Sequence, residues 1–390
     1  MLSWMVYLMS HNAILKYPGG KKSELTFIRD NLPHRIRDFY DPFVGGGSVF
    51  LNIECDRDYH INDISNELIQ LYLDVQNLNP VFFNDIQVIS NAWDTLSSYL
   101  GNQEVKTQII TILKEYFQDN DWERLEIGVT EFLDQHSEPY INMAQADIGV
   151  KLKRIKRNTF DNIIRKIARM ERLRESRGAL SDEDMVKNIA SAIKSTFYYH
   201  FRNLYNLASK GRIGDQHRSA YFFFIREYCF SSMFRYNQQG DFNVPYGGVS
   251  YNKKSISSKI EYMQSDFVTS LFSRAHFYNE DFETFLRKKP LTYEDLVFID
   301  PPYDTEFSSY SGDAFQKKDQ RRLQNYLLNH CQAKFLMVIK ETDFINSLYL
   351  EKSHKPSGVK ITIERYEKNY SVSFINRNKK NVTHLIIRNY

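Results

Sequence analysis

A glycine-rich loop between two short apolar stretches constrains the fold of this 390-residue chain more than any other feature. Residues 36–40 have the pattern of a β-strand and end at Asp41, and residues 59–62 form a second such stretch that ends at Asp63. Residues 48–53, between the two stretches, have the pattern of a helix start. This order of strand, glycine loop, helix and strand predicts a βαβ unit.

The loop itself, Asp41-Pro42-Phe43-Val44-Gly45-Gly46-Gly47-Ser48, is typical of a turn that approaches a ligand closely. Its three glycines allow a tight turn with no Cβ in the way. The three glycines alone would also fit an ordinary tight turn without a ligand. However, Asp63 follows at the roughly 20-residue distance at which doubly wound nucleotide-binding folds place a carboxylate for the ribose. The Gly-Lys-Ser/Thr of a phosphate-binding P-loop is missing. Together these features predict an adenosine-type ligand.

A second motif, Asp300-Pro301-Pro302-Tyr303, follows the apolar residues 296–299. Two successive prolines fix φ and make the turn rigid. Ligands of open α/β sheets bind at the carboxyl ends of the strands, where the Asp300 carboxylate and the Pro301 carbonyl would offer two adjacent acceptors. Two acceptors suit an amino group, and the Tyr303 ring offers a face on which a base can stack. The alternative is a stiff turn that only ends a strand.

The rest of the chain divides by pattern into an α/β part and a helical part. Residues 1–75 and 266–390 alternate strands with helices, and residues 76–265 are mainly helical. Strands are expected at 296–300, 334–339, 359–366 and 382–388, and helices at 85–117, 151–177, 183–207 and 317–330. We therefore expect one sheet domain, formed by 1–75 and 266–390, that is interrupted by a second domain at 76–265.

The helix expected at 151–177 carries a one-sided excess of lysine and arginine. Charge between apolar residues at helical spacing is usual for the solvated face of an amphipathic helix. In a DNA-binding protein the same stripe would contact phosphates, which supply affinity rather than sequence choice. We expect Lys153 and Arg157 to make such contacts.

Composition narrows the class of protein but does not identify a partner. The net charge of +3 is small, and nucleic-acid binding depends on clustered charge. The 3 cysteines form no C-x-x-C pair and the 10 histidines show no metal-ligand spacing, so we expect neither a disulfide framework nor a bound metal. Residues 1–9 are apolar but too short to cross a membrane, so we expect a cytoplasmic protein.

In combination, the motifs resemble those of the Dam-like family (D12 class, α group) of S-adenosylmethionine-dependent DNA adenine-N6 methyltransferases. Residues 16–21, the glycine loop, Asp63 and the 300–303 turn occur in the order of that family, and residues 235–247 resemble its hairpin that probes the DNA duplex. The resemblance covers roughly residues 1–75 and 200–390. It implies a Rossmann-like methyltransferase sheet flanked by helices and a mainly helical target-recognition domain with a β-hairpin. Residues at about 84–195 match no motif of the family.

The resemblance also implies roles for individual residues. Contact with the cofactor S-adenosylmethionine is expected from Tyr17, Lys21, Asp41, Pro42, Phe43, Gly45, Gly47, Asp63, Asp281, Phe282 and Asp300. Tyr17 stands where the family has tryptophan, and Asp281 is expected to accept from the cofactor's adenine amino group. The catalytic residues are expected to be Asp300, Pro301, Pro302 and Tyr303. Contact with double-stranded DNA is expected from Arg235, Tyr236, Asn237, Gln238, Gln239 and Asn243.

We therefore predict a site-specific enzyme that methylates N6 of an adenine flipped out of duplex DNA. A bacterial or phage-encoded origin is expected, with the protein at the nucleoid when it is bound to DNA and a separately acting restriction endonuclease as a candidate partner. Methylation of cytosine N4 is an alternative with similar chemistry, although Asp rather than Ser at position 300 favours adenine. A non-catalytic DNA-binding relative is a second alternative, which the intact Asp300, Tyr303 and glycine loop oppose. The duplex-probing segment argues against RNA.

Overall fold

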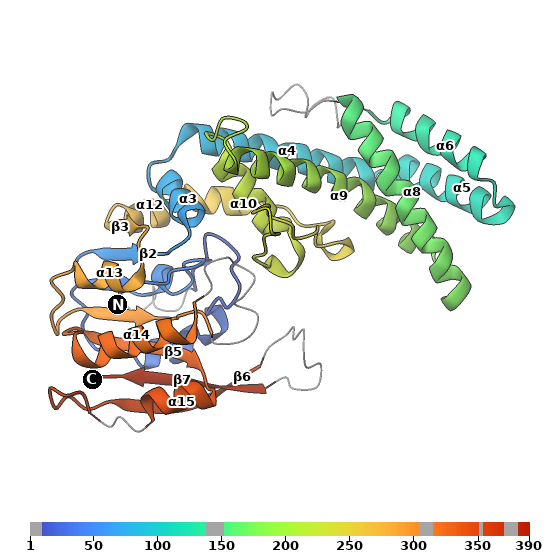
Figure 1. Cartoon of the computed structure of the whole chain (residues 1–390). Coiled ribbons are helices and arrows are strands. Elements are labelled where there is room, and N and C mark those ends of the chain that lie inside the picture. Colours follow the sequence, from blue (N-terminus) through green and yellow to red (C-terminus); the bar gives the residue numbers. More distant parts are fainter. Residues whose placement is uncertain (1–9, 138–151, 304–314, 351–353, 370–380) are drawn as a thin grey trace, which may run out of the picture. The chain divides into compact units, whose positions relative to one another are not determined.

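The computed structural model describes residues 10–137, 152–303, 315–350, 354–369 and 381–390 (Figure 1). The chain divides into two compact units, of which the first comprises Met1–Asn77 and Gln264–Tyr390 and the second Leu78–Met263. Residues 1–9, expected to be too short for a membrane span, and Lys151, expected to begin the basic helix, lie outside the described residues. No helix among the described residues is long and apolar enough to cross a membrane.

The first unit is built on a seven-stranded sheet in the order β3-β2-β1-β4-β5-β7-β6. Its strands are β1 (Phe39–Asp41), β2 (Tyr59–Asn62), β3 (Ala275–Tyr278), β4 (Leu296–Ile299), β5 (Lys334–Lys340), β6 (Thr362–Asn369) and β7 (Asn381–Arg388). Strands β1 to β5 are parallel to one another, and β7 is antiparallel to both β5 and β6. The α/β prediction is confirmed, and the architecture is consistent with a Rossmann-like methyltransferase sheet.

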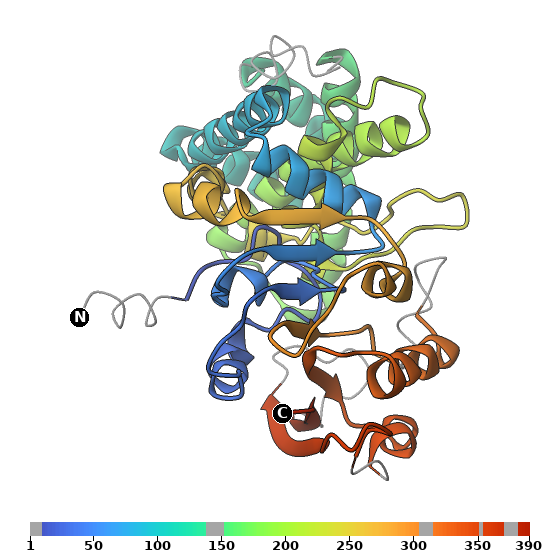
Figure 2. The ribbon, with the colours of Figure 1, turned by 90° about the vertical axis from the view of Figure 1, so that its left-hand side faces the viewer.

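The strands are added outward from the centre of the sheet, first on one side and then on the other. From β1 the chain adds β2 and β3 on one side, then β4 and β5 on the other, so the order reverses between β1 and β4. In Figure 2 the gold strand β3 lies beside the blue strand β2, although the whole second unit separates them in sequence. Open α/β sheets bind ligands at such a switch point, outside the carboxyl ends of the strands. Asp41 ends β1 and Asp300 follows β4, so both lie at this position.

Helices cover both faces of this sheet. On one face, Val297 and Ile299 of β4 belong to a buried cluster with apolar residues of α13 (Phe282–Arg287), α14 (Lys317–Asn329) and α15 (Asp343–Tyr349). Because side chains alternate between the two faces along a strand, the residues next to Val297 and Ile299 on β4 point to the other face. There Tyr72 of α3 (Asn66–Gln76) stacks on Phe277 of β3, with ring centroids 5.1 Å apart. The remaining helices of this unit are η1 (Lys22–Glu24), α2 (Leu25–Asp30), η2 (Phe50–Asn52) and α12 (Asp266–Phe272).

The helix expected to start at 48–53 was wrong in extent. Only the 3₁₀ turn η2 forms there, because Ile53 is already extended and β2 begins at Tyr59. The stretch therefore has room for a single turn. The helix that packs against the sheet, α3, comes after β2 instead. Strand β3 was absent from the expected strands.

Helices also make up most of the second unit as described. They are α4 (Pro80–Gly101), α5 (Gln103–Asp119), α6 (Trp122–Gln135), α8 (Leu152–Arg177), α9 (Asp182–Ser209), α10 (Arg218–Tyr228) and α11 (Ser257–Met263), with the 3₁₀ turns η3 (Phe230–Ser232) and η4 (Val249–Tyr251). The single helix expected at 85–117 is two helices, broken at Asn102. Asn102 is extended, and its side chain accepts the Glu104 N–H at 2.7 Å. Asparagine is a favoured N-cap, so it begins a new helix here.

Candidate active site

A residue that the sequence motifs did not include stabilises the turn after β4. Gln320 of α14 is fully buried, and its side-chain amide donates to the Pro302 carbonyl at 2.9 Å. Because the prolines already restrict φ, this bond leaves the turn little freedom. The Asp300 side chain is 21% exposed, so its carboxylate faces a partly open space at the end of the strand. Nothing in the sequence distinguished Gln320 from the other polar residues of this helix.

Lys21 joins the first and last motifs of the site. Its ammonium nitrogen lies 2.6 Å from each carboxylate oxygen of Asp300 and 3.0 Å from the Tyr303 hydroxyl. The side chain is 1% exposed, and the Lys21 backbone N–H donates to the Ser48 hydroxyl at 3.0 Å. Burial raises the pKa of Asp300, and the nearby Lys21 charge opposes that rise. The sequence singled out each of these residues but did not predict this pairing.

The glycine loop has a shape that side chains would prevent. Gly45 and Gly47 have φ values of +51° and +78°, which glycine adopts without strain. A Cβ on Gly46 would lie 2.3 Å from the Leu15 carbonyl oxygen. A Cβ on Gly45 would come within 3.1 Å of the Tyr17 ring, so Tyr17 lies directly against the loop. The structure therefore brings the predicted Tyr17 and the predicted loop together.

Two buried aspartates stabilise the loop from the ends of β1 and β2. Asp41 accepts the Phe43 N–H at 3.1 Å. Asp63 accepts the Gly45 N–H at 3.1 Å with one oxygen and the Ser65 N–H at 2.9 Å with the other. Burial raises the pKa of both carboxyl groups. Lys21 binds Ser48 of the loop with its backbone and Asp300 with its side chain, and Asp63 binds Gly45, so the predicted loop, ribose and catalytic positions share one neighbourhood.

Three aromatic rings gather beside the loop. Phe43 lies 5.4 Å from Phe282 and 5.5 Å from Phe315, measured between ring centroids, and Phe282 lies 5.6 Å from Phe315. Asp281 precedes Phe282 and caps α13 by accepting the Glu283 and Thr284 N–H groups. It also pairs with Arg322 at 2.7 Å and keeps a 39% exposed side chain. The sequence missed the Arg322 pairing, and contact between Asp281 and an adenine stays a prediction.

In the second unit, residues 235–247 form a short hairpin. Tyr236 and Phe242 are bridged in antiparallel fashion, and the Arg235 guanidinium binds the Asn243 side chain at 2.8 Å. Asn237 shapes the tip, because its side-chain oxygen accepts the Gln239 and Asp241 N–H groups. The expected DNA-contacting residues therefore differ in their surroundings. Four of them hold the hairpin together, and Gln238 and Gln239 are exposed at its tip.

Helix α8 presents a basic face to solvent. Ile155, Ile163 and Ile167 are buried, and the exposed cations are Lys153, Arg154, Arg157, Arg165, Arg169 and Arg172. None of these six pairs with a carboxylate among the residues that the structure describes, whereas Lys156 on the same helix pairs with Asp134 at 2.9 Å. From Arg154 to Arg172 the helix extends about 27 Å at 1.5 Å per residue. The predicted Lys153 and Arg157 belong to this face.

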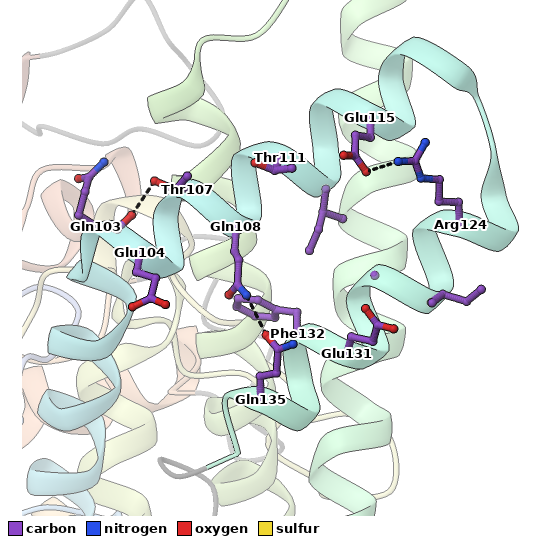
Figure 3. A pocket seen from close by; sticks show the side chains of 13 residues that line it. Gln103, Glu104, Thr107, Gln108, Thr111, Glu115, Arg124, Glu131, Phe132 and Gln135 are labelled. Carbon is purple, nitrogen blue, oxygen red and sulfur yellow. Dashed lines mark hydrogen bonds and ion pairs between the residues drawn. The ribbon is translucent and has the colours of Figure 1, made fainter.

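An open groove of about 620 Å³ lies between α5 and α6 in the second unit (Figure 3). Side-chain pairs span it at two points, Gln108 with Gln135 at 2.8 Å and Arg124 with Glu115 at 3.0 Å. Its walls come from these two helices alone, and no residue expected in the site lines it. The groove is therefore separate from the chemistry of the sheet edge.

Comparison with known families gives one match that extends over most of the chain. The model of the D12 class N6 adenine-specific DNA methyltransferases matches residues 17–127 and 129–363. The match includes the glycine loop, Asp63 and the 300–303 turn. It also runs across the helical residues 84–195, for which the sequence motifs offered no counterpart.

Individual relatives agree with this match. The chain is 25% identical over 390 residues to the type II methyltransferase M.CviBI of Paramecium bursaria Chlorella virus NC1A, which covers 97% of this chain and 99% of the viral protein. A DNA adenine methylase of Vibrio cholerae is 22% identical over 322 residues, 81% of this chain and 76% of its own length. The retron Ec67 DNA adenine methylase of Escherichia coli is 30% identical over 168 residues, 42% of this chain and 54% of its own length.

Proposed function

The chain belongs to the D12 class of N6 adenine-specific DNA methyltransferases, and from this membership we propose that it methylates N6 of an adenine flipped out of duplex DNA, with S-adenosylmethionine as the methyl donor. One observation carries the proposal. The Asp300 carboxylate stands on a rigid turn at the switch point of the sheet, and the Lys21 ammonium group binds both this carboxylate and the Tyr303 hydroxyl. This arrangement suits the recognition of an amino group rather than the generation of a nucleophile.

The glycine loop fits an adenosine-type donor. A Cβ on Gly45, Gly46 or Gly47 would meet Tyr17, Leu15 or Tyr72, so the three glycines let the loop pack closely against the protein and keep its tight shape. Asp63 uses one lone pair of each oxygen for backbone N–H groups, and a carboxylate has about four such sites, so acceptors remain for the ribose hydroxyls. Phe43 and Phe282 offer apolar ring faces for the adenine. When bound, the donor supplies a methyl group that its sulfonium already activates.

We propose that Asp300 and the Pro301 carbonyl accept hydrogen bonds from the N6 amino group of the target adenine. Lys21 donates to both Asp300 oxygens, and its charge favours the ionised carboxylate. The carboxylate is partly exposed and has about four acceptor sites, so sites remain for the amino group. Two such bonds localise the nitrogen lone pair, which is delocalised into the ring in free adenine. The Tyr303 ring holds the base by stacking. Orientation and fixed charge then supply most of the rate acceleration.

The proposed DNA contacts divide into two kinds. Gln238 and Gln239 are exposed at the hairpin tip and have amide groups that can read base edges. Lys153 and Arg157 belong to the basic face of α8, which suits phosphates and supplies affinity independent of sequence. We propose that the second unit is the target-recognition domain on these grounds. The catalytic and cofactor-binding domain is then the first unit.

The biological setting follows from the relatives and is part of the proposal. One relative is named as a type II methyltransferase, which supports a restriction-modification role with a separate endonuclease. The three cysteines are buried free thiols, which suits the reducing cytoplasm in which bacterial and phage DNA is found. Adenine is favoured over cytosine N4 because the matching family is adenine-specific.

A transfer assay tests this proposal. Purified protein is incubated with duplex DNA and methyl-labelled S-adenosylmethionine, and the digested nucleosides are identified by mass spectrometry. N6-methyladenine is the expected product. N4-methylcytosine as the product would favour the cytosine alternative, and donor binding without any transfer would favour a non-catalytic relative.

A further inference from the structure

A second cluster of titratable side chains lies behind Lys21 and Tyr303, and the proposed reaction does not use it. Glu24 comes from η1, Tyr366 and Lys368 from β6, and His384 from β7. Glu24, Lys368 and His384 are 4%, 9% and 0% exposed. Charged groups are rarely buried to this degree unless they are paired, so their presence beside the site requires a reason.

Glu24 is the centre of the cluster. One of its carboxylate oxygens accepts from the Tyr366 hydroxyl and lies 3.4 Å from His384 Nδ1, and the other accepts from the Lys368 ammonium group. The Glu24 backbone N–H donates to the Lys21 carbonyl at 2.8 Å. Glu24 thus connects the segment that carries Lys21 to the last two strands of the sheet.

His384 extends the cluster to the Tyr303 ring. The two ring centroids are 5.6 Å apart at an interplanar angle of 88°, so the imidazole lies edge-on to Tyr303. Tyr366 supports the imidazole from another side, with centroids 5.6 Å apart. The Tyr303 hydroxyl also receives a bond from Lys21, so Tyr303 is held by contacts to both its ring and its hydroxyl.

The charges of the cluster and of the site are paired. Lys21 is opposed by Asp300 and Lys368 by Glu24. Asp41, at the end of β1, is a further buried carboxyl group close to Asp300. Burial alone would raise the pKa of Glu24, but the hydrogen bond from His384, the Lys21 charge and the bonds from Lys368 and Tyr366 lower it to about 2. Removal of one charge from such a set leaves another without a partner.

We propose that Glu24 is a positioning residue for methyl transfer, which holds Lys21, Tyr303 and His384 in the arrangement that keeps the Asp300 acceptors directed at the substrate amino group. This inference rests on the proposed function. Without the Glu24 charge, Lys368 loses the carboxylate to which it donates, and the connection between the Lys21 segment and the last two strands is weakened. The Asp300 acceptors are then less well directed at the amino group.

The test substitutes Glu24→Gln, which keeps the size and removes the charge. We expect kcat to fall about tenfold, with KM for DNA and for S-adenosylmethionine within about threefold of the wild type. Glu24 raises the pKa of Asp300, so the acid limb of the kcat profile should move to lower pH in this variant. A role in folding alone would not move that limb.

The Lys368→Met variant should shift the acid limb of the kcat profile in the opposite direction. Lys368 lowers the pKa of Asp300, so its loss should move the acid limb to higher pH. Glu367→Gln is the matched control, since Glu367 is exposed on the same strand and bonds only to Thr383 among the pairings described. Its kcat and its pH profile should equal those of the wild type.

The outcomes are distinct. A lower kcat in Glu24→Gln, together with opposite shifts of the acid limb in the two variants, supports the proposal. Unshifted limbs, shifts of the same sign or an unchanged kcat in Glu24→Gln overturn it, and if that variant does not fold, an unshifted limb in Lys368→Met overturns it alone. A wild-type protein that transfers no methyl group to DNA adenine would instead contradict the proposed function, in the reference measurement itself.

Discussion

The ammonium nitrogen of Lys21 lies 2.6 Å from both carboxylate oxygens of Asp300, although the two residues are 279 positions apart in sequence. The same nitrogen bonds to the Tyr303 hydroxyl. One side chain near the start of the chain therefore orients both functional groups of the turn that follows β4. In a partly desolvated site, a fixed ion pair of this kind keeps the carboxylate charged and directed.

Lys21→Met should lower kcat about 100-fold, because Asp300 loses its counter-charge and Tyr303 its hydrogen bond. Lys21→Arg keeps the charge but not the compact geometry, so we expect it to recover part of the loss. Single-turnover methylation separates this effect from donor binding. A wild-type rate constant in Lys21→Met would show that the pairing is not needed for transfer.

Asp63→Asn should weaken binding of S-adenosylmethionine about 10-fold to 100-fold. The amide has one oxygen instead of two, so it cannot both hold the Gly45 and Ser65 N–H groups and accept ribose hydroxyls. Titration calorimetry without DNA measures the change directly. Asp30→Asn, an exposed site on α2, is the control and should bind as the wild type does. Unaltered affinity in Asp63→Asn would rule out the ribose role.

Glu24 should make stability depend on pH in a defined window. Its pKa falls from 4.5 to about 2 on folding, so its contribution is fully present above pH 4.5 and is lost as the pH falls toward 2. Linkage gives that contribution a size on the order of 3 kcal/mol. Denaturant unfolding at several pH values should show the free-energy difference between wild type and Glu24→Gln shrinking across this window. A free-energy difference between the two proteins that does not change with pH would contradict the lowered pKa of Glu24 in the folded protein.

Local sequence signals predicted the loop and the turns better than the contacts between them. The three glycines, Asp63 and the two prolines each have a local physical reason, so their positions at the ends of β1, β2 and β4 could be inferred. The Asx-type cap at Asn102 was also present in the sequence, but helical periodicity on both sides concealed it.

Long-range pairings had no comparable signal. Lys21 was expected near the donor, and nothing in its neighbours pointed to Asp300. Gln320 and Glu24 look like ordinary helical residues until the fold buries them. Such contacts depend on how distant segments pack, which spacing along one segment does not record.

The basic face of α8 should appear as a salt dependence of DNA binding. Substitution of Lys153 and Arg157 by glutamine removes two proposed phosphate contacts and should reduce the slope of log K against log salt by about 2. Sequence preference should not change, because phosphates carry no sequence information. The control substitutes Lys114 and Arg124, which already pair with carboxylates in the same unit. An equal loss of slope in both double variants would mean that α8 has no special role.

Methylome sequencing tests the central claim most directly. DNA is taken from cells that express the wild type, Asp300→Ala or the exposed-site control Asp30→Ala, in a host without its own adenine methylation. We predict N6-methyladenine at a defined sequence with the wild type and with Asp30→Ala, and none with Asp300→Ala. The same modification in all three, or the pattern of the empty host in all three, would contradict the account.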